Sequence, residues 1–469
     1  MTDSLTQAPV APAEHVVYRK RRNIELLLDL FAMALGLGGW ALTHLDADGV
    51  MPSNWPWVIG IWLGLGLAMH GVVRWRLPWA DPVLLPCVLL LNGLGLAMID
   101  RLDRVKGVGP VGAPMQLVWT ALGMACCAAV VIWLRDHRRL QRFPYLMAIV
   151  GVMLLLLPLV PGIGRSINGA RVWIHVGPFS LQPSELSKIM LALAFASYLE
   201  ERREVLALAG RDVFGLALPR LRDLGPIVIM WGAAMAVFVF QNDFGMCLLF
   251  FGLFVMMLYV ATERPGWPVL GLLMLVVGGY GAYGSARHIR VRVNAWLHPF
   301  DNYDQNYQVI QAQFGFAWGG LTGRGWGLGR PWMTPLAKSD FISAALGEEL
   351  GIIGLMAIVM VYAIIVARSL RVALASHDAF GKLLASGLGF VFALQVFAII
   401  GGVTRLLPLT GLTTPFMSQG GSSMLSNWVI LGILLVISNQ ARRPPVRVAP
   451  TSDELSNEDT MVIPVVRGQ

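Results

Sequence analysis

The sequence predicts an all-α polytopic membrane protein with about twelve transmembrane helices. Of its 469 residues, 56% are hydrophobic and only 14% are charged, and the mean hydropathy is +0.63. Soluble domains carry about 25% charged residues. Many apolar stretches also reach the roughly 20 residues that a helix needs to cross a bilayer. Together these observations exclude a soluble fold.

Twelve segments are long and apolar enough to be membrane-spanning helices. In chain order they cover about residues 24–44, 55–73, 82–99, 115–134, 145–161, 185–200, 225–241, 244–261, 266–284, 341–367, 383–402 and 425–440. The first segment follows a basic stretch, as the apolar part of a signal peptide does. Because it is too long for that part and has no clear small-residue cleavage site, we expect a retained helix.

The basic residues predict how these helices are oriented. Lys and Arg are concentrated in loops on the same side as the basic N-terminus, and cytoplasmic loops carry such an excess. We therefore expect both termini to be cytoplasmic. This bias accounts for the net charge of +8, which thus indicates no nucleic-acid partner. The four cysteines lie in apolar runs and show neither metal-ligand spacing nor a disulfide pattern.

Four of the segments outside the predicted helices are distinguished by their composition or length, namely the two ends of the chain and two long loops. Residues 1–23 form a basic cytoplasmic N-terminus, and the polar residues 441–469 form a disordered cytoplasmic tail. Two predicted extracytoplasmic loops, about 162–184 and 285–340, are longer than ordinary connections. The second is rich in Trp, Phe and Tyr, and Trp and Tyr settle at the level of the lipid headgroups. We expect it to fold against the membrane surface.

Charged residues at the outer ends of the helices are the first candidates for a site. Glu185 and Lys188 follow a helix start at Pro183-Ser184 and are three residues apart, so they share one helix face. They either form a local pair that complements the helix dipole or line a polar groove. Asp243 lies between two apolar helices and either makes an Asx turn or faces the same groove.

Two further groups of polar residues lie in apolar surroundings. Glu348 and Glu349 fall inside an apolar helix, where a carboxylate costs a few kcal/mol unless it is paired or faces a wet cavity. Residues 401–424 are rich in Gly, Pro, Ser and Thr, and are either an ordinary loop or a site for an anionic headgroup or pyrophosphate. The candidate side chains of this segment are Arg405, Ser418 and Ser422.

Six motifs occur in an order and spacing that identify a family. They are Gly169-Ala170 with Trp173-Ile174; Gln182-Pro183-Ser184-Glu185 with Lys188; Asn242-Asp243; Tyr307-Gln308; Ser339-Asp340-Phe341 with Gly347-Glu348-Glu349-Leu350-Gly351; and Pro408-Leu409-Thr410-Gly411 through Gly420-Gly421-Ser422-Ser423. In these motifs the chain resembles the SEDS family, the RodA/FtsW/SpoVE group of bacterial cell-wall polymerases. The resemblance implies a ten-helix core over residues 81–440, preceded at 24–80 by two extra helices. Those two helices make the chain most similar to actinobacterial RodA members.

The resemblance also implies an activity and partners. The activity is that of a peptidoglycan glycosyltransferase, which polymerises lipid II into β-1,4 glycan strands on the outer side of the bacterial cytoplasmic membrane, for cell elongation and shape rather than for division. The implied partners are lipid II, the growing glycan strand, membrane lipids and a class B penicillin-binding protein that acts as transpeptidase. A divalent cation, Mg²⁺ or Mn²⁺, is implied, with no site assigned to it.

The family's essential acid lies in the second long loop, six residues before the tyrosine of Tyr-Gln. Counting back from Tyr307 gives Asp301. Asn302 stands where the family usually has proline, and one residue is missing between Pro299 and the acid. This departure leaves Asp304 as the second candidate.

A mechanism follows from the chemistry of the implied substrate. Conversion of an α-linked pyrophosphate into a β-1,4 linkage is an inversion and requires direct displacement at the anomeric carbon. As general base, Asp301 would take the proton of the acceptor hydroxyl, a contribution of roughly 10²–10⁴-fold. Lys188, Arg171, Arg405 or a cation would stabilise the departing pyrophosphate.

Two other classes of protein stay open. A flippase would move a lipid-linked precursor across the bilayer, although inspection of the sequence finds no inverted repeat typical of transporters. A non-catalytic scaffold would recruit a partner transpeptidase.

Overall fold

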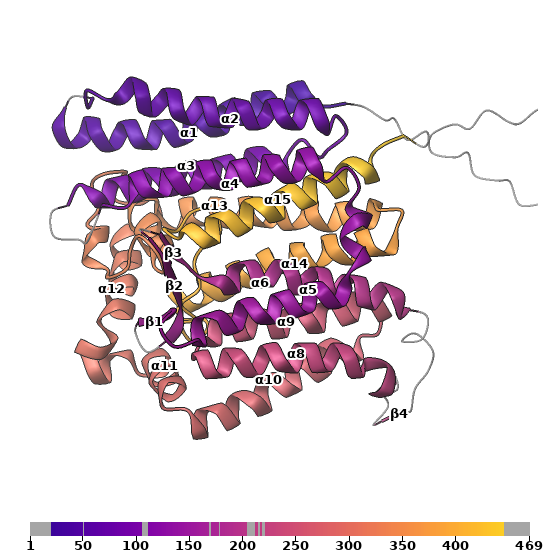
Figure 1. Ribbon diagram of the computed structural model, residues 1–469. Coiled ribbons are helices and arrows are strands. Elements are labelled where there is room, and N and C mark those ends of the chain that lie inside the picture. The colour runs from indigo at the N-terminus through magenta and orange to yellow at the C-terminus, as the bar shows by residue number, and fades with distance from the viewer. Residues whose placement is uncertain are drawn as a thin grey trace, which may run out of the picture.

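The computed structural model describes residues 20–49, 51–105, 111–167, 170–177, 179–203, 212–213, 216–217 and 221–444. Most of residues 1–23 and 441–469, the predicted N-terminus and tail, lie outside these ranges. Within them, long helices lie side by side in one bundle (Figure 1).

Helices make up most of the described chain. The α-helices are α1 (Arg22–Asp48), α2 (Trp55–Arg76), α3 (Leu84–Asp103), α4 (Ala113–Trp133), α5 (Pro144–Leu156), α6 (Pro183–Glu201), α8 (Leu221–Gln241), α9 (Phe244–Thr262), α10 (Gly266–Ser285), α11 (Arg287–Leu297), α12 (Tyr303–Gly319), α13 (Ile342–Ala375), α14 (Ala379–Val403) and α15 (Gly421–Ala441). Short 3₁₀ helices are η1 (His137–Arg142), η2 (Leu157–Leu159), η3 (Pro299–Asn302) and η4 (Pro331–Met333). The strands are β1 (Gly164–Ile167), β2 (Ala170–Val176), β3 (Phe179–Leu181), β4 (Asp212–Val213) and β5 (Leu216–Ala217).

Each of the twelve predicted spans coincides with one of these helices. Nine helices of the described chain are long and apolar enough to cross a membrane: α1, α2, α3, α4, α9, α10, α13, α14 and α15. Helix α5 is apolar but shorter, and in α8 the apolar stretch covers only residues 225–241. Helix α6 has the length, but Glu185, Lys188 and two glutamates at its end reduce its apolar character. The prediction of an all-α multi-pass membrane protein is confirmed.

The two ends of the bundle differ. One end carries α11, α12 and the sheet β1–β2–β3 (Figure 1), and we call it the cavity end. At the opposite end, Arg22 at the start of α1 donates to the carbonyl of Ala80, and Arg442 after α15 lies 3.3 Å from the Asp81 carboxylate. The first helix therefore begins, and the last one finishes, on the same side of the bundle, as twelve crossings require.

The two long loops contain more regular structure than the sequence analysis predicts. The segment 162–184 forms an antiparallel sheet in the order β1–β2–β3. On β2, Val172 and Ile174 are buried, while the alternate residues Arg171, Trp173 and His175 are more exposed. The segment 285–340 folds into α11, η3, α12 and η4, and α12 packs along α13.

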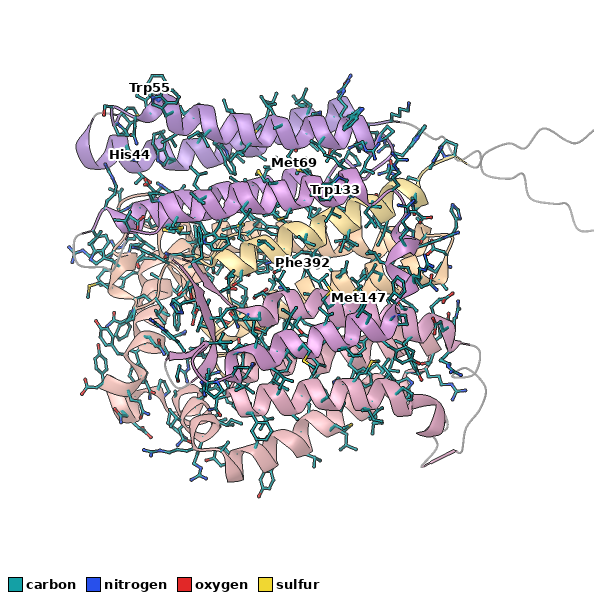
Figure 2. The ribbon with its side chains drawn as sticks, viewed as in Figure 1. His44, Trp55, Met69, Trp133, Met147 and Phe392 are labelled. Atoms are coloured by element: carbon teal, nitrogen blue, oxygen red, sulfur yellow. The ribbon has the colours of Figure 1, made fainter. Side chains whose placement is uncertain are left out.

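The core lies around α3, α14 and α15, and the N-terminal helices cover one flank of it. Figure 2 shows the large apolar side chains; Phe392 on α14 is buried, whereas Trp133 at the end of α4 is 78% exposed. Helix α1 lies against α3, and α2 against α4. The α1–α3 contact is close because Gly36 faces Gly93: a Cβ on Gly36 would lie 2.9 Å from the Gly93 Cα.

Candidate functional site

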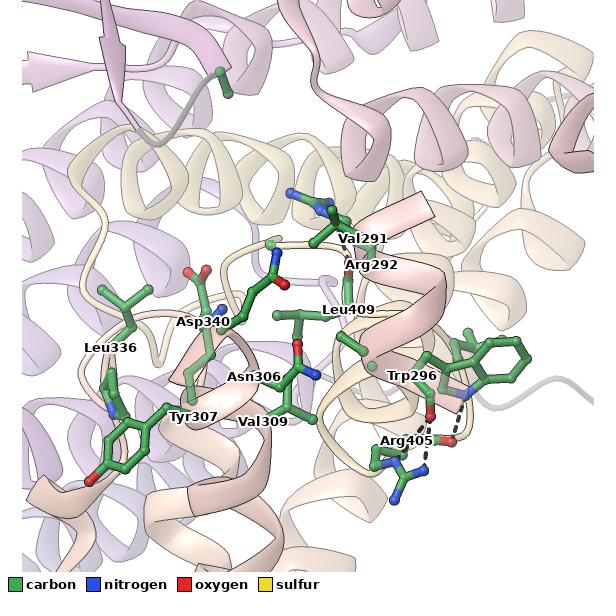
Figure 3. Close-up of a pocket in the computed structure, with 18 of the residues that line it drawn as sticks. Val291, Arg292, Trp296, Asn306, Tyr307, Val309, Leu336, Asp340, Arg405 and Leu409 are labelled. Carbon is green, nitrogen blue, oxygen red and sulfur yellow. Dashed lines mark hydrogen bonds between the residues drawn. The ribbon is translucent and has the colours of Figure 1, made fainter. Parts of the chain in front are cut away.

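A cavity of about 900 Å³ opens at the cavity end of the bundle. Its walls come from α11, from the first half of α12, and from the segments 335–340 and 402–411, as Figure 3 shows. The side chains that decide its chemistry are Arg287, Arg292, Trp296, Asp304, Tyr307, Asp340 and Arg405. The cavity therefore offers both arginines and carboxylates to a ligand.

The two candidate acids of the second long loop take different positions. Asn302 caps α12, since its side chain accepts a hydrogen bond of 3.2 Å from the backbone N–H of Gln305. Asp304 then falls in the first turn of α12 and lines the cavity. Asp301 lies in η3 just before the cap, is exposed, and is not part of the cavity wall. Catalytic contacts often form only with substrate bound, so the role of each acid stays a prediction.

Arg292 interacts through its charge with two carboxyl groups, those of Asp243 and Asp340. It donates from Nη1 to the carbonyls of Leu409 and Thr410, at 3.3 and 3.0 Å. Burial raises the pKa of Asp340 to about 6, against a hydrogen bond from Ser339 and the charge of Arg292. Near neutral pH this carboxyl can therefore both bind and release a proton.

Asp243 is the second carboxyl group beside Arg292. It caps α9, accepting from the backbone N–H of Met246 at 3.1 Å, and it also accepts from Gln182 at 3.3 Å. Burial raises its pKa to about 6, while the Met246 hydrogen bond and the Arg292 charge oppose this. Asp243 thus makes the predicted helix-end turn and also lies in the electrostatic field of the cavity.

Arg405 and Trp296 form a reciprocal pair on the cavity wall, drawn with dashed lines in Figure 3. The Trp296 indole donates to the Arg405 carbonyl at 2.9 Å, and the Arg405 guanidinium donates to the Trp296 carbonyl at 2.9 and 3.2 Å. Arg405 has a positive φ of 62°. The structure therefore places the predicted Arg405 in the cavity, held to α11.

Glu185 and Lys188 lie in the core, away from the cavity wall. The Lys188 ammonium is 2.5 Å from the Glu185 carboxylate and 3.3 and 3.4 Å from the side-chain oxygens of Asn427 and Gln395. Ser426 donates to Glu185 at 2.9 Å. The pair is only 2% and 1% exposed. It ties α6 to α14 and α15, and its predicted role in substrate binding stays untested.

Glu348 and Glu349 also lie outside the cavity wall, where they hold the glycine-rich loop that follows α12. The backbone N–H of Arg330 donates to Glu348 at 2.6 Å, and that of Gly327 donates to Glu349 at 3.0 Å. Arg101 approaches Glu349 at 3.4 Å. The pairing that the sequence analysis requires for these buried acids is thus supplied by backbone N–H groups and an arginine.

The remaining predicted residues bind the backbone of neighbouring segments. Ser418 donates to the Ser339 carbonyl at 2.6 Å, and Ser422 accepts from the backbone N–H of Gln182 at 3.1 Å. Arg171, on β2, donates to the Val160 carbonyl at 3.4 Å. These contacts join the sheet and the segment 401–424 to the cavity end of the bundle.

Arg287, Arg292 and Asp340 are cavity residues that the sequence analysis did not select. The signal for the two arginines was their position: they occur in a predicted outside loop, although Lys and Arg normally collect in cytoplasmic loops. An arginine cluster that departs from this bias indicates an anion-binding role. Asp340 was part of a recognised motif, but its approach to Arg292 depends on tertiary contacts.

Potential metal ligands occur in two places. In the described part of the chain, a single group of three or more His, Cys, Asp or Glu donors comes together, namely Glu25, Asp29 and His70, near the end opposite the cavity. In the cavity, the carboxylates are those of Asp304 and Asp340. Mg²⁺ is commonly held by one or two carboxylates together with substrate phosphates, so the cavity fits such a cation only with a phosphorylated ligand present.

Comparison with solved structures supports the architecture. The chain superposes on a peptidoglycan synthase complex, described as coordinating polymerization and crosslinking, with a TM-score of 0.62, 25% identity, and coverage of 78% of this chain and 99% of that one. The crystal structure of the Thermus thermophilus rod shape determining protein RodA gives a TM-score of 0.54 at 25% identity, covering 78% of this chain and 98% of that one.

Comparison of sequences identifies the family. The family model of FtsW, RodA and SpoVE, described as "Cell cycle protein", matches residues 82–443. The chain is 45% identical over 444 residues to the peptidoglycan glycosyltransferase RodA of Mycobacterium tuberculosis, covering 93% of this chain and 94% of that protein. It is 33% identical over 375 residues to the probable peptidoglycan glycosyltransferase FtsW of Geobacter metallireducens, covering 78% and 96%. The chain therefore belongs to the FtsW/RodA/SpoVE family, as its motifs predicted, and within that family it is similar to mycobacterial RodA.

Proposed function

We propose that this protein is a peptidoglycan glycosyltransferase that polymerises lipid II into β-1,4 glycan strands. The observation that carries the proposal is the cavity, in which arginines and carboxylates meet at one end of a membrane bundle. The 45% identity with a protein named peptidoglycan glycosyltransferase RodA supports the same activity. An enzyme of this kind must bind a pyrophosphate and remove a proton from a hydroxyl, and the cavity holds groups for both tasks.

In the proposed reaction the acceptor hydroxyl attacks the anomeric carbon of the donor sugar as the undecaprenyl pyrophosphate leaves. A carboxylate of the loop takes the hydroxyl proton. The spacing to Tyr307 favours Asp301 for this role, and the position of Asp304 in the cavity wall supports Asp304 as the alternative. Arg292 and Arg405 carry the positive charge that stabilises the developing pyrophosphate, since charged donors in a partly desolvated site act strongly on such groups. A Mg²⁺ or Mn²⁺ ion would add positive charge there, held by Asp304 or Asp340 and the phosphates.

The proposal includes the setting of the reaction. The cavity end faces outward from the cytoplasmic membrane of a bacterium, and both termini are cytoplasmic; the loop charges support this orientation. The glycan strands serve elongation and cell shape, which the similarity to RodA supports. The partner is a class B penicillin-binding protein, and the similarity to a synthase complex that coordinates polymerization with crosslinking supports such a partner.

The test uses purified full-length protein with lipid II and Mg²⁺, and the products are separated on a gel. We expect long glycan strands from the wild type and a loss of roughly 10²–10⁴-fold in rate for Asp301→Asn. Asp304→Asn should reduce the rate less than Asp301→Asn does, because Asp340 would still be present to hold the cation. The matched control is Glu263→Gln, which removes an exposed acid at the opposite end of α9 and should leave the rate unchanged.

Each other outcome has a defined reading. An inactive Asp304→Asn beside an active Asp301→Asn would move the base to Asp304, and full activity of both would refute a loop acid as base. Wild-type protein that moves lipid II across vesicle membranes without making strands would instead be a flippase. Protein that only stimulates strand synthesis by an added penicillin-binding protein would be a scaffold.

A further inference from the structure

A compact polar cluster lies inside the apolar N-terminal helices, before the residues that match the family model. Glu25 and Asp29 are four residues apart on α1 and therefore share one helix face. His70 reaches them from α2. The exposed fractions are 0% for both acids and 4% for His70. Three ionisable side chains are thus enclosed at the junction of α1 and α2.

Several atoms of this cluster that could bind a metal ion make no hydrogen bond among the described residues. The His70 Nδ1 atom lies 2.9 Å from Asp29 Oδ2 and 3.8 Å from Glu25 Oε2. In contrast, Glu25 Oε1, Asp29 Oδ1 and His70 Nε2 are buried, and each lacks a hydrogen-bond partner among the described residues. Leaving a buried polar atom without a partner destabilises the folded state. Their coincidence on three adjacent side chains points to a shared ligand.

The charges of the cluster indicate a cation. Two carboxylates face Arg22, which pairs with Glu25 and donates to the Ala80 carbonyl. With a neutral imidazole, these groups carry a net charge of −1 in an apolar interior, where unbalanced charge is expensive. A divalent cation would remove this negative charge and leave the group at +1, whereas one added proton would leave it neutral without a metal, so measuring the metal content separates the two cases.

We propose that Glu25, Asp29 and His70 bind a divalent transition-metal ion that fastens α2 to α1. One ligand atom from each residue lies within 4.8 Å of the others. Binding would require side-chain rotations that bring one atom of each residue to the roughly 2.0–2.2 Å at which Zn²⁺ binds imidazole nitrogen and carboxylate oxygen. Mixed nitrogen and oxygen ligands of this kind suit Zn²⁺, Mn²⁺ or Fe²⁺. The site is separate from the cavity, so it is independent of the proposed reaction.

The experiment measures Zn²⁺ on the full-length protein, purified without a polyhistidine tag and stripped with a chelator. After dialysis against Zn²⁺, we expect one equivalent per chain by mass spectrometry of the metal. Asp29→Asn and His70→Gln should each weaken binding at least tenfold. The matched control is His44→Gln, near the other end of α1, which removes an imidazole that bonds a single carboxylate, Asp100, at 2.9 Å.

Co²⁺ as a substitute probe keeps the test decisive if the variants fail to fold. On wild-type protein, X-ray absorption should show Co²⁺ in a shell of nitrogen and oxygen with imidazole scattering. Absence of stoichiometric Zn²⁺ on the wild type, binding that survives both substitutions, or a Co²⁺ shell without imidazole would each overturn the proposal. The first of these results would show that the Arg22–Glu25 pair and the His70–Asp29 contact hold the cluster together without a metal ion.

Discussion

Replacing Lys188 by methionine should destabilise the bundle strongly, because the change leaves the Glu185 carboxylate buried without its cation. The ammonium contacts Glu185 at 2.5 Å and lies 3.3–3.4 Å from two further side-chain oxygens, and both members of the pair are at most 2% exposed. Removing one partner of such a buried pair costs about 3–5 kcal/mol. Ser426 would remain as a neutral donor to Glu185, which places the expected loss toward the lower end, near 3 kcal/mol.

A double-mutant cycle measures the interaction free energy of Lys188 with Glu185 separately from their other contacts. Lys188→Met, Glu185→Gln and the combined variant are unfolded in mixed micelles with increasing SDS and followed by tryptophan fluorescence. The double variant should lose less stability than the sum of the single losses, since no lone charge remains. The exposed pair Arg203–Glu263, at 3.6 Å, provides the control, and Arg203→Gln should change the unfolding midpoint little.

The opposite pattern would refute this reasoning. If Lys188→Met unfolds within about 1 kcal/mol of the wild type yet makes no glycan strands, the ammonium acts on the substrate rather than on the fold. The interpretation of Lys188 as a substrate ligand, which the sequence analysis left open, would then be correct.

Three further predictions concern other parts of the molecule. The pKa of Asp340 is about 6 in the folded state against 3.8 in the unfolded chain, so the folded state binds more protons between these pH values. The free energy of unfolding should therefore fall as the pH rises from about 4 to 6. Asp340→Asn should flatten that part of the stability curve, measured by thermal unfolding. Gly351→Ala should cost more than about 1–2 kcal/mol, because φ is +71° and the new Cβ would lie 2.3 Å from the Gly323 nitrogen; an unchanged unfolding midpoint would contradict it. Glu349→Gln should loosen the loop that Arg101 and Glu349 hold, seen as faster hydrogen exchange at residues 323–330, whereas unchanged exchange would show that Glu348 alone suffices.

The helices could be predicted because their signal is local. A run of apolar residues is visible in the sequence, and α6 was found despite Glu185 and Lys188. The sheet was missed although β2 carries a signal of its own: Val172, Ile174 and Val176 alternate with larger polar or aromatic residues, the period of a half-buried strand.

The site could be predicted only in part, because its contacts join distant segments. Arg292 meets the carbonyl of Thr410, 118 positions away, and Lys188 meets Asn427, 239 positions away. The identities of these residues suggested polar roles, yet sequence spacing cannot show which of them share a cavity. As a result Arg405 lines the cavity, while Glu348 and Glu349 bind a loop, and the predicted roles of all three in substrate binding stay predictions.

The hydrogen bonds between α11 and the chain after α14 have a mechanical consequence. Five of them act together: two from Arg292, one from Trp296 and two from Arg405. At about 1 kcal/mol each, lifting α11 away would cost roughly 5 kcal/mol, so the detached arrangement would occur in on the order of one molecule in several thousand. Helix α11 is therefore held against the chain after α14 in nearly all molecules. A ligand that displaced α11 would have to replace these bonds with contacts of its own, at a cost of roughly 5 kcal/mol.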